Sequence, residues 1–225
     1  MDFLNKKNTD LSDSELFGIH LYYDEICVVL KDSRVKSTLA FLHSNIIHSL
    51  TNTVYGYHLS PFISMCSILE QLGKCYNVIG ETEPSYNNNL KRCLAYFSKL
   101  PSDDQIYPTL VGFRNGLVHN GSLVGSTKHK GRVYNYFFRY DKTSPTVIRA
   151  AAKEWTGDYR DLNRPGNEFV TWINPDRLWD LVVSILEFAN SLNNQNKLIL
   201  RLENGNMELY WNYLMVAPLV KSSLF

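Results

Sequence analysis

Residues 113–121 read FRNGLVHNG, and the predicted secondary structure changes from helices to strands just after this stretch. Gly121 predicts the end of a helix, because glycine is favoured in the left-handed conformation that closes helices. The helix itself is expected to begin at the capping box Ser102-x-x-Gln105 or at Pro108. A few residues beyond the glycine, the period of the apolar residues changes from helical to alternating. The stretch therefore separates a helical half from a segment that is rich in strands.

Four further helices are expected before this one. Ser12-x-x-Glu15 is a capping box, which predicts a helix start. Ser60-Pro61 predicts another helix start, with serine as the N-cap and proline in the first turn. Another helix is expected after Ser33, and apolar residues recur at helical spacing in all four. The four stripes are Leu16, Ile19, Tyr23, Ile26 and Leu30; Leu39, Leu42, Ile46, Leu50 and Val54; Met65, Ile68, Leu72, Tyr76 and Ile79; and Leu90, Leu94 and Phe97.

Strands are predicted after the FRNGLVHNG stretch. In RVYNYFFRY (132–140) every second residue is aromatic, so one face of a strand is aromatic. That face either packs on the core or stacks on the bases of RNA. TVIRAAAKEW (146–155) is expected as the partner strand and EFVTWI (168–173) as a third strand, before Asn174-Pro175 begins a long helix. The aromatic residues are Tyr134, Tyr136, Phe138 and Tyr140.

The segment KLILRLENGNMELYW (197–211) predicts a hairpin near the C-terminus. Asn204-Gly205 is a favoured pair at the centre of a tight two-residue turn. Counting outward from that turn places Arg201 opposite Glu208, a favourable cross-strand charge pair. The same count pairs Leu202 with Met207, Leu200 with Leu209 and Leu198 with Trp211 on one face.

These elements together predict a mainly α fold with β elaborations, in one domain that covers residues 1–225. The expected parts are a helical core at 12–125, a β insertion at 126–173, a last core helix at 174–192 and a C-terminal hairpin at 197–214. A chain of this length can bury one sizeable core.

Composition excludes several classes of protein. The chain is 44% hydrophobic with a net charge of +1, which argues against wholesale disorder and against a global attraction to nucleic acid or anionic membranes. MDFLNKKNTD has no apolar signal core, and no apolar run approaches the ~20 residues that span a bilayer. We therefore expect a cytoplasmic protein without a membrane partner. The cysteines, which form no CxxC pair, are interpreted as reduced core residues, with a zinc site as the alternative; they are Cys27, Cys66, Cys75 and Cys93.

Positive charge gathers in the middle of the chain. Residues 114–164 contain ten Lys or Arg and four Asp or Glu, an excess of six, so the remainder carries −5. Lys128, Lys130 and Arg132 lie just before the aromatic strand, and basic residues beside aromatic ones are typical of single-stranded RNA binding. We expect these three residues either to contact RNA or to form a solvated basic loop.

Arg114, Asn115 and His119 are the candidates for chemistry. Arginine offers a permanent charge and a planar fork that suits phosphate, and histidine exchanges a proton near neutral pH. Asn115 lies four residues before His119, on nearly the same helix face, where it can orient the histidine. Arg114 and His119 lie about 140° apart on the helix, so they flank a groove edge or meet across two copies of the helix. These side chains, with no carboxylate cluster beside them, point to transesterification of RNA by the neighbouring 2′-hydroxyl, without metal or cofactor.

The run Arg114-Asn115-Gly116-Leu117-Val118-His119 resembles the RNxxxH form of the Rx4–6H motif of HEPN (higher eukaryotes and prokaryotes nucleotide-binding) domains. The resemblance implies a helical bundle that reaches Leu192, with the motif near the end of a late helix. It also implies a metal-independent endoribonuclease, a toxin or defence effector, with a composite site between the two subunits of a homodimer. An antitoxin or regulatory protein is the further partner that it implies. The tyrosine that one subgroup carries two residues after the histidine is replaced by Gly121 here.

The resemblance also implies a role for each matched residue. Arg114 binds the scissile phosphate, His119 acts as general base or acid, and Asn115 orients His119 or contacts phosphate. Glu70 is the candidate acidic partner of Arg114, although it lies about 140° from the apolar stripe of its own helix, where a solvated glutamate is also expected.

Two other functions fit the same residues. One is a HEPN-like module that binds RNA or nucleotide without cleaving it. The other is a helical interaction protein, in which Arg114 forms a surface ion pair and His119 interacts with the dipole of its helix.

Overall fold

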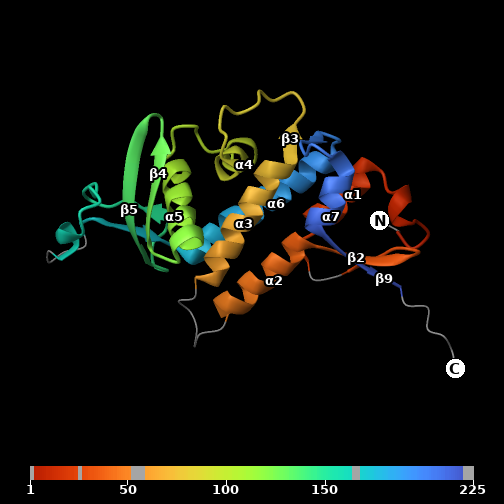
Figure 1. Ribbon diagram of the computed structural model, residues 1–225, viewed down its shortest axis with the longest axis horizontal. Helices are drawn as coiled ribbons and strands as arrows, with labels where there is room; N and C mark the ends of the chain where they lie inside the picture. The colour runs from red at the N-terminus through yellow and green to blue at the C-terminus, as the bar shows by residue number, and fades with distance from the viewer. Residues whose placement is uncertain (1–2, 25–26, 52–58, 164–167, 220–225) are drawn as a thin grey trace.

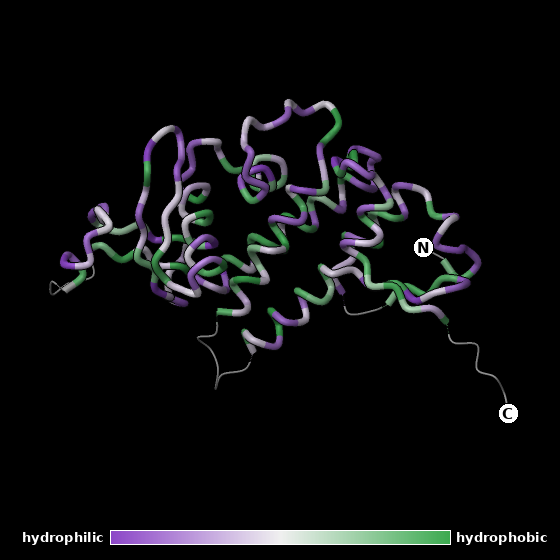
Figure 2. Tube along the Cα trace, viewed as in Figure 1, coloured by the Kyte–Doolittle hydropathy of each residue, from purple (hydrophilic) through white to green (hydrophobic). Residues whose placement is uncertain are grey.

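Helices fill the middle of an elongated molecule, and sheets lie at both of its ends (Figure 1). The computed structural model describes residues 3–24, 27–51, 59–163 and 168–219, so the expectations for Ile26 and Val54 lie outside the described residues. Figure 2 shows hydrophobic residues gathered along the central helix α3 (Ser60–Cys75).

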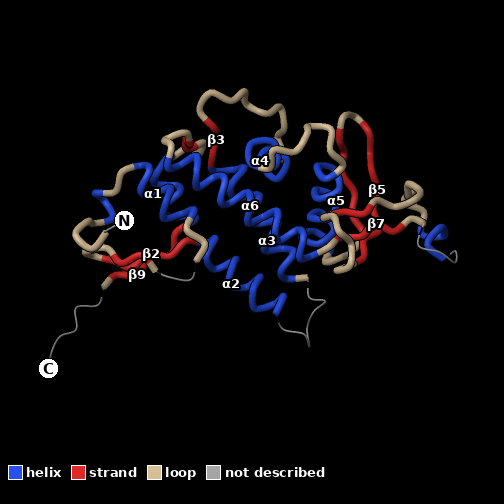
Figure 3. The backbone as a smooth tube through the Cα atoms, turned by 180° about the vertical axis from the view of Figure 1, so that it is seen from behind, coloured by secondary structure: helices blue, strands red, loops and turns tan. Residues whose placement is uncertain are grey.

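The fold is mixed α/β, and the expectation of a mainly α bundle was wrong. In the described residues, seven α-helices are accompanied by nine strands in three sheets. Figure 3 shows β2 and β9 at one end of the molecule, β5 and β7 at the other, and β3 beside the helices between them. Two of these sheets join segments that are distant in the sequence, and their short strands replace the ends of expected helices. The other helices are α1 (Asp13–Leu21), α2 (Thr38–Thr51), α4 (Asn89–Phe97), α5 (Ile106–Asn120), α6 (Pro175–Asn194) and α7 (Gly205–Tyr213), with 3-10 turns at Asn8–Asp10 and Tyr159–Asn163.

Local capping chemistry decides where several helices begin. The Ser12 side chain accepts a hydrogen bond from the Glu15 backbone, and the Glu15 carboxylate accepts one from the Ser12 backbone, so the expected capping box is confirmed. The Asn174 side chain accepts hydrogen bonds from the first two N–H groups of α6, which confirms that start too. Ser60 is already helical, however, and Leu59 takes the N-cap position of α3.

The first sheet connects the two ends of the chain. The first helix ends at Leu21, nine residues earlier than expected, because the chain turns into β1 (Val28–Val29) and β2 (Ser33–Ser37). The inner strand β2 pairs antiparallel with β1 and with β9 (Leu214–Pro218), from the far end of the sequence. The helix expected directly after Ser33 therefore begins only at Thr38.

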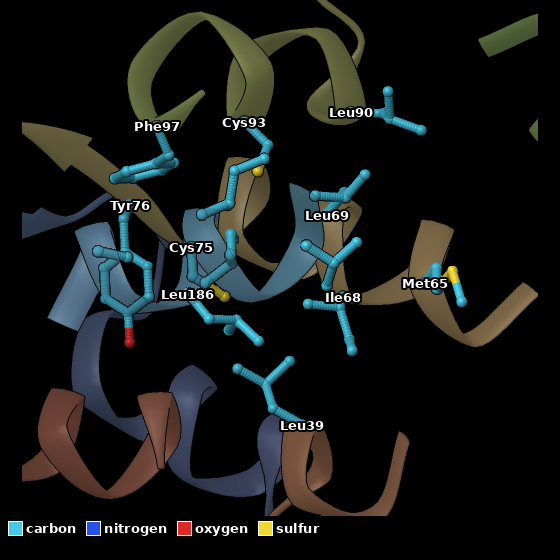
Figure 4. Close-up of a cluster of buried hydrophobic side chains, with 14 of the residues drawn as sticks. Leu39, Met65, Ile68, Leu69, Cys75, Tyr76, Leu90, Cys93, Phe97 and Leu186 are labelled. Carbon is cyan, nitrogen blue, oxygen red and sulfur yellow. The ribbon is translucent and has the colours of Figure 1, made fainter. Parts of the chain in front are cut away.

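The core lies around α3, whose buried side chains point both toward α4 and toward α2 and α6 (Figure 4). Ile68, Leu69 and Leu72 have no exposed surface. The helix ends at Cys75 because β3 (Tyr76–Val78) pairs antiparallel with β8 (Leu198–Leu200).

This pairing also explains why the expected C-terminal hairpin was wrong. Leu198 and Leu200 pair with Val78 and Tyr76, not with Trp211 and Leu209. With that strand already paired, residues after Asn204 form α7 and bury Leu209 in the core. The expected partners Arg201 and Glu208 instead lie 3.7 Å from Glu83 and from Lys74, respectively.

A four-stranded sheet covers α5 at the opposite end of the molecule (Figure 1). The strands β4 (Val124–His129), β5 (Arg132–Tyr140), β7 (Val170–Ile173) and β6 (Ile148–Arg149) lie in this order, with β5 and β7 parallel and the other pairs antiparallel. The sheet thus begins at Val124, two residues before the expected boundary. Only two residues of the expected partner strand 146–155 form β6, which pairs with β7, and the segment meets β5 only at the isolated bridge between Asn135 and Trp155. The neighbours of β5 are β7 and β4, and the hairpin turn Lys130-Gly131 connects β4 to β5.

The aromatic face of β5 packs on the core. Phe138 is fully buried against Phe113 of α5, with ring centroids 4.9 Å apart, and Tyr140 stacks on Phe62 at 4.6 Å. The rings of Tyr134 and Tyr136 continue the same stacked row toward the surface. Of the two interpretations of this face, the structure supports packing.

Candidate active site

The stretch FRNGLVHNG lies at the C-terminal end of α5, where the helix closes as predicted. Gly121 has φ 57°, and its N–H bonds to carbonyls of the last helical turn. The backbone of β4 runs directly against this helix: a Cβ on Gly116 would lie 2.5 Å from the Val124 carbonyl oxygen. The space beside Gly116 is therefore taken by the strand, and the strand thereby holds the end of the helix.

Arg114 and His119 meet within one chain. Nη1 of Arg114 lies 2.7 Å from Nε2 of His119, because the long arginine side chain reaches around the 140° that separates the two positions. A guanidinium can only donate hydrogen bonds. Nε2 must therefore accept, and the imidazole is neutral with its proton on Nδ1. The His119 side chain is exposed at the rim of the helix end, where a ligand can reach it.

Glu70 of α3 holds the guanidinium from the other side. One carboxylate oxygen accepts a hydrogen bond from Nη2 of Arg114 at 3.2 Å. The other lies 2.8 Å from Nε, an ion-pair contact in which the buried Nε–H is not hydrogen-bonded. The side chains of Glu70 and Arg114 are 26% and 21% exposed, so the pair is shielded but reachable. The structure thus brings Glu70 to Arg114, and the alternative of a solvated glutamate does not describe it. Hydrogen bonds to Glu70, His119 and Asn115 use three of the five N–H groups, and Nε is buried, so the second N–H of Nη2 remains for a bound phosphate.

Asn115 contacts the strand and the arginine. Its Nδ2 donates to the Ser126 carbonyl of β4 at 3.0 Å, and its Oδ1 lies 3.5 Å from Nη1 of Arg114. The asparagine therefore ties the end of α5 to β4 and orients Arg114, a different arrangement from the expected orientation of His119.

A polar cavity of about 340 Å³ opens beside the Glu70–Arg114 pair. Lys74 lines it one turn after Glu70, and Tyr213, at the end of α7, lies across from it. The Tyr213 side chain hydrogen-bonds Lys74 and raises the pKa of the ammonium, so Lys74 stays charged at neutral pH. Sequence reasoning missed both residues. The i,i+4 spacing from Glu70 was a signal for Lys74, whereas nothing local pointed to Tyr213.

The three basic candidates separate into two groups. Lys128 and Lys130 line a second cavity, together with Lys91 of the first turn of α4. Arg132 instead forms an ion pair with Glu154 and lies over the ring of Tyr134. Its guanidinium is therefore paired with a carboxylate at the exposed surface.

The cysteines follow the expected pattern with one exception. Cys66, Cys75 and Cys93 are buried, and all three are free thiols whose pKa values are raised by burial. Cys27 is exposed, so it is no core residue. Among the described residues, no three His, Cys, Asp or Glu side chains gather as a metal site would need.

Within the described segments, no helix is both long enough and apolar enough to cross a bilayer. Comparison of the chain with protein-family models, with curated proteins and with solved structures gives no match.

Proposed function

We propose that the chain is a metal-independent endoribonuclease of HEPN type, with Arg114, His119 and Glu70 at its site. The observation that carries the proposal is the 2.7 Å contact between Arg114 Nη1 and His119 Nε2, with Glu70 bound to the same guanidinium. A phosphate-binding charge and a proton carrier thereby lie side by side at the surface. Comparison with known proteins adds nothing in favour, so the proposal rests on this geometry and on the motif.

The proposed reaction follows from the donors and acceptors present. A scissile phosphodiester binds Arg114, whose N–H groups turn from His119 to the non-bridging oxygens. Nε2 of His119 then becomes free to take the proton of the neighbouring 2′-hydroxyl. The 2′-oxygen bonds to phosphorus and the bond from phosphorus to the 5′-oxygen breaks, with Arg114 stabilising the added negative charge. The products are a 2′,3′-cyclic phosphate and a 5′-hydroxyl.

A homodimer would complete this chemistry. The departing 5′-oxygen needs a proton, and His119 has just accepted one, while the Glu70 carboxylate is bound to Arg114. A second copy of α5 facing the first would supply a protonated His119 as the general acid, in line with the composite sites of the family that the motif resembles. A role as a toxin or defence effector, and a regulatory partner protein, rest on the resemblance alone.

A non-catalytic RNA- or nucleotide-binding module is the second candidate. The observation in its favour is that His119 Nε2 and the Arg114 guanidinium already satisfy each other and Glu70, so that both catalytic groups are engaged. In such a module the arginine binds phosphate while the histidine only supports it.

Cleavage in EDTA distinguishes the two candidates. Wild-type protein, His119→Ala and the control Val118→Ala are incubated with labelled single-stranded and structured RNAs, and the product ends are mapped. Val118 is the adjacent residue and is 44% exposed, so its truncation tests only damage to the helix end. Cleavage by wild type and Val118→Ala, but not by His119→Ala, supports the ribonuclease. If none of the three cleaves while all bind RNA equally, the module is the better description.

A further inference from the structure

Lys91, in the first turn of α4, is a buried cation whose partners are not carboxylates. Only 6% of the residue is exposed. Its Nζ donates to the Lys128 carbonyl at 3.2 Å and lies 3.1 Å from Nδ1 of His129, itself 8% exposed. Burial lowers the pKa of Lys91, and burial with the nearby charges of Lys91 and Lys130 lowers the pKa of His129. A buried ammonium is stabilised when an anion approaches it, so this arrangement fits a negatively charged ligand.

The space for such a ligand is present. A cavity of about 400 Å³ is lined by Lys91, His129, Lys130, Tyr86 and the N-cap residue Asn88. Lys130 is held at its rim by the hairpin turn, in the left-handed conformation with φ 48°. The ring of Tyr86 stacks on His129, with centroids 6.4 Å apart, and forms the wall. With Lys128, three lysines and the N-terminus of a helix therefore line one cavity.

The cavity lies next to the proposed active site. Asn88 lines this cavity, and the following residue, Asn89, lines the cavity beside Arg114 and Glu70. The strand β4 links the two sites as well: Ser126 binds Asn115, and His129 is three residues further along. At the rise of a β-strand, three residues cover about 10 Å. A nucleic-acid strand can therefore reach both sites.

We propose that this cavity is a subsite for a phosphate group of single-stranded RNA, with Lys91 and Lys130 as its cationic ligands. The RNA strand rests on the proposed function, because it runs from this phosphate to the Arg114–His119 pair. The phosphate chemistry itself does not depend on cleavage. A free nucleotide carries the same phosphate group, and the experiment below separates the two sources.

Binding is measured in the cleavage-deficient His119→Ala background, by fluorescence anisotropy with a labelled single-stranded RNA over a series of salt concentrations. Lys91→Met removes the charge and keeps an apolar chain of similar length in the buried position. Lys130→Asn removes the charge with a residue that tolerates the left-handed conformation. Lys31→Met is the control, because Lys31 is exposed and lies between β1 and β2; Figure 1 shows β2 at the opposite end of the molecule from β4.

We expect Lys91→Met and Lys130→Asn each to weaken RNA binding about tenfold, as loss of a charge-assisted contact does. Each should also lower the slope of log affinity against log salt by about 0.7, the value for one phosphate of a single strand. Lys31→Met should change neither quantity. If Lys91→Met fails to fold, Lys130→Asn carries the test, because its side chain is exposed.

Two results overturn the subsite. One is wild-type affinity and salt slope in both variants. The other is a loss of binding confined to adenosine monophosphate, measured in parallel, which assigns the cavity to a free nucleotide. The two proposals also fail separately. If the wild type cleaves RNA but the lysine variants bind RNA as the wild type does, only the subsite proposal is refuted. If the lysine variants bind RNA more weakly but the wild type does not cleave it, only the ribonuclease proposal is refuted.

Discussion

Gly125→Ala should destabilise the protein through the close approach of β4 to α5. A Cβ at this position would lie 1.9 Å from the Gly112 carbonyl oxygen and 3.0 Å from the Gly116 nitrogen. Ordinary contact begins at 3.4 Å, so the strand must move by about 1.5 Å. Both obstacles are backbone atoms and cannot rotate away. Overpacking of this kind lowers the free energy of unfolding by about 3 kcal/mol at its upper range, and loss of the Asn115–Ser126 hydrogen bond lowers it by about 1 kcal/mol more. Replacement of glycine by alanine in a strand raises it by roughly 0.5–1 kcal/mol.

The expected net loss in the free energy of unfolding is therefore about 3 kcal/mol, which lowers Tm by about 6–12 °C for a chain of this length. The assay is urea and thermal denaturation of Gly125→Ala beside Ser126→Ala, whose truncated side chain is exposed on the same strand. The control should stay within 0.5 kcal/mol of wild type. RNA cleavage should fall with stability in Gly125→Ala, since the strand holds the end of α5. A variant as stable as wild type would refute the view that this glycine contact joins helix and strand.

Three further predictions address stability and catalysis. His20 is fully buried, and burial lowers the pKa of its imidazole from 6.5 to about 4, so an unfolded chain takes up a proton there that the folded chain excludes. His20 therefore contributes about 3 kcal/mol to the free energy of unfolding, and this contribution is complete above pH 6.5 and is lost as the pH falls toward 4. Denaturation of wild type and His20→Gln across this pH range should show that the free energy of unfolding falls more steeply with decreasing pH in the wild type. Parallel pH profiles of the two proteins would contradict this role of His20. Asn174→Ala should lower the free energy of unfolding by about 2–3 kcal/mol in urea denaturation, because it removes the N-cap of α6 and two hydrogen bonds to the Lys142 and Ser144 carbonyls. A change below about 0.5 kcal/mol would show that Asn174 does not stabilise this helix start. Glu70→Gln should reduce RNA cleavage at least tenfold while stability changes by no more than about 1 kcal/mol, because the ion pair is partly exposed; unchanged cleavage would remove Glu70 from the site.

The parts of the fold that sequence could predict depend on short-range chemistry. The capping box at Ser12, the N-cap at Asn174 and the C-terminal cap at Gly121 each involve groups within a few residues of one another. The aromatic alternation of 132–140 likewise predicts its own strand.

The errors arose where a partner lies far away in the chain. Nothing near Tyr76–Val78 shows that Leu198–Leu200 will pair with it, and the same holds for Ser33–Ser37 and Leu214–Pro218. Helical spacing continued through these short strands, and tertiary pairing overrode it. The turn signal Asn204-Gly205 was real, but it starts a helix because the strand before it was already paired.

The candidate site likewise contains residues that the local sequence predicts and residues that only distant packing brings there. Arg114, Asn115 and His119 are recognisable because the motif is contiguous, and Glu70 became a candidate only through the family resemblance, which implies an acidic partner for the arginine on a neighbouring helix. Lys91 and Tyr213 enter only through packing of α4 on the β4–β5 turn and of α7 beside α3. No local pattern distinguishes such residues from other surface lysines and tyrosines.

The nature of the nucleophile tests the account most directly. An RNA that the protein cleaves in EDTA is resynthesised with a single 2′-deoxynucleotide immediately 5′ to the mapped bond. The account predicts that cleavage at that bond disappears and that the all-RNA substrate yields 2′,3′-cyclic phosphate and 5′-hydroxyl ends. Undiminished cleavage of the deoxy-substituted bond would mean that the 2′-hydroxyl does not attack, and it would contradict the mechanism built on Arg114 and His119.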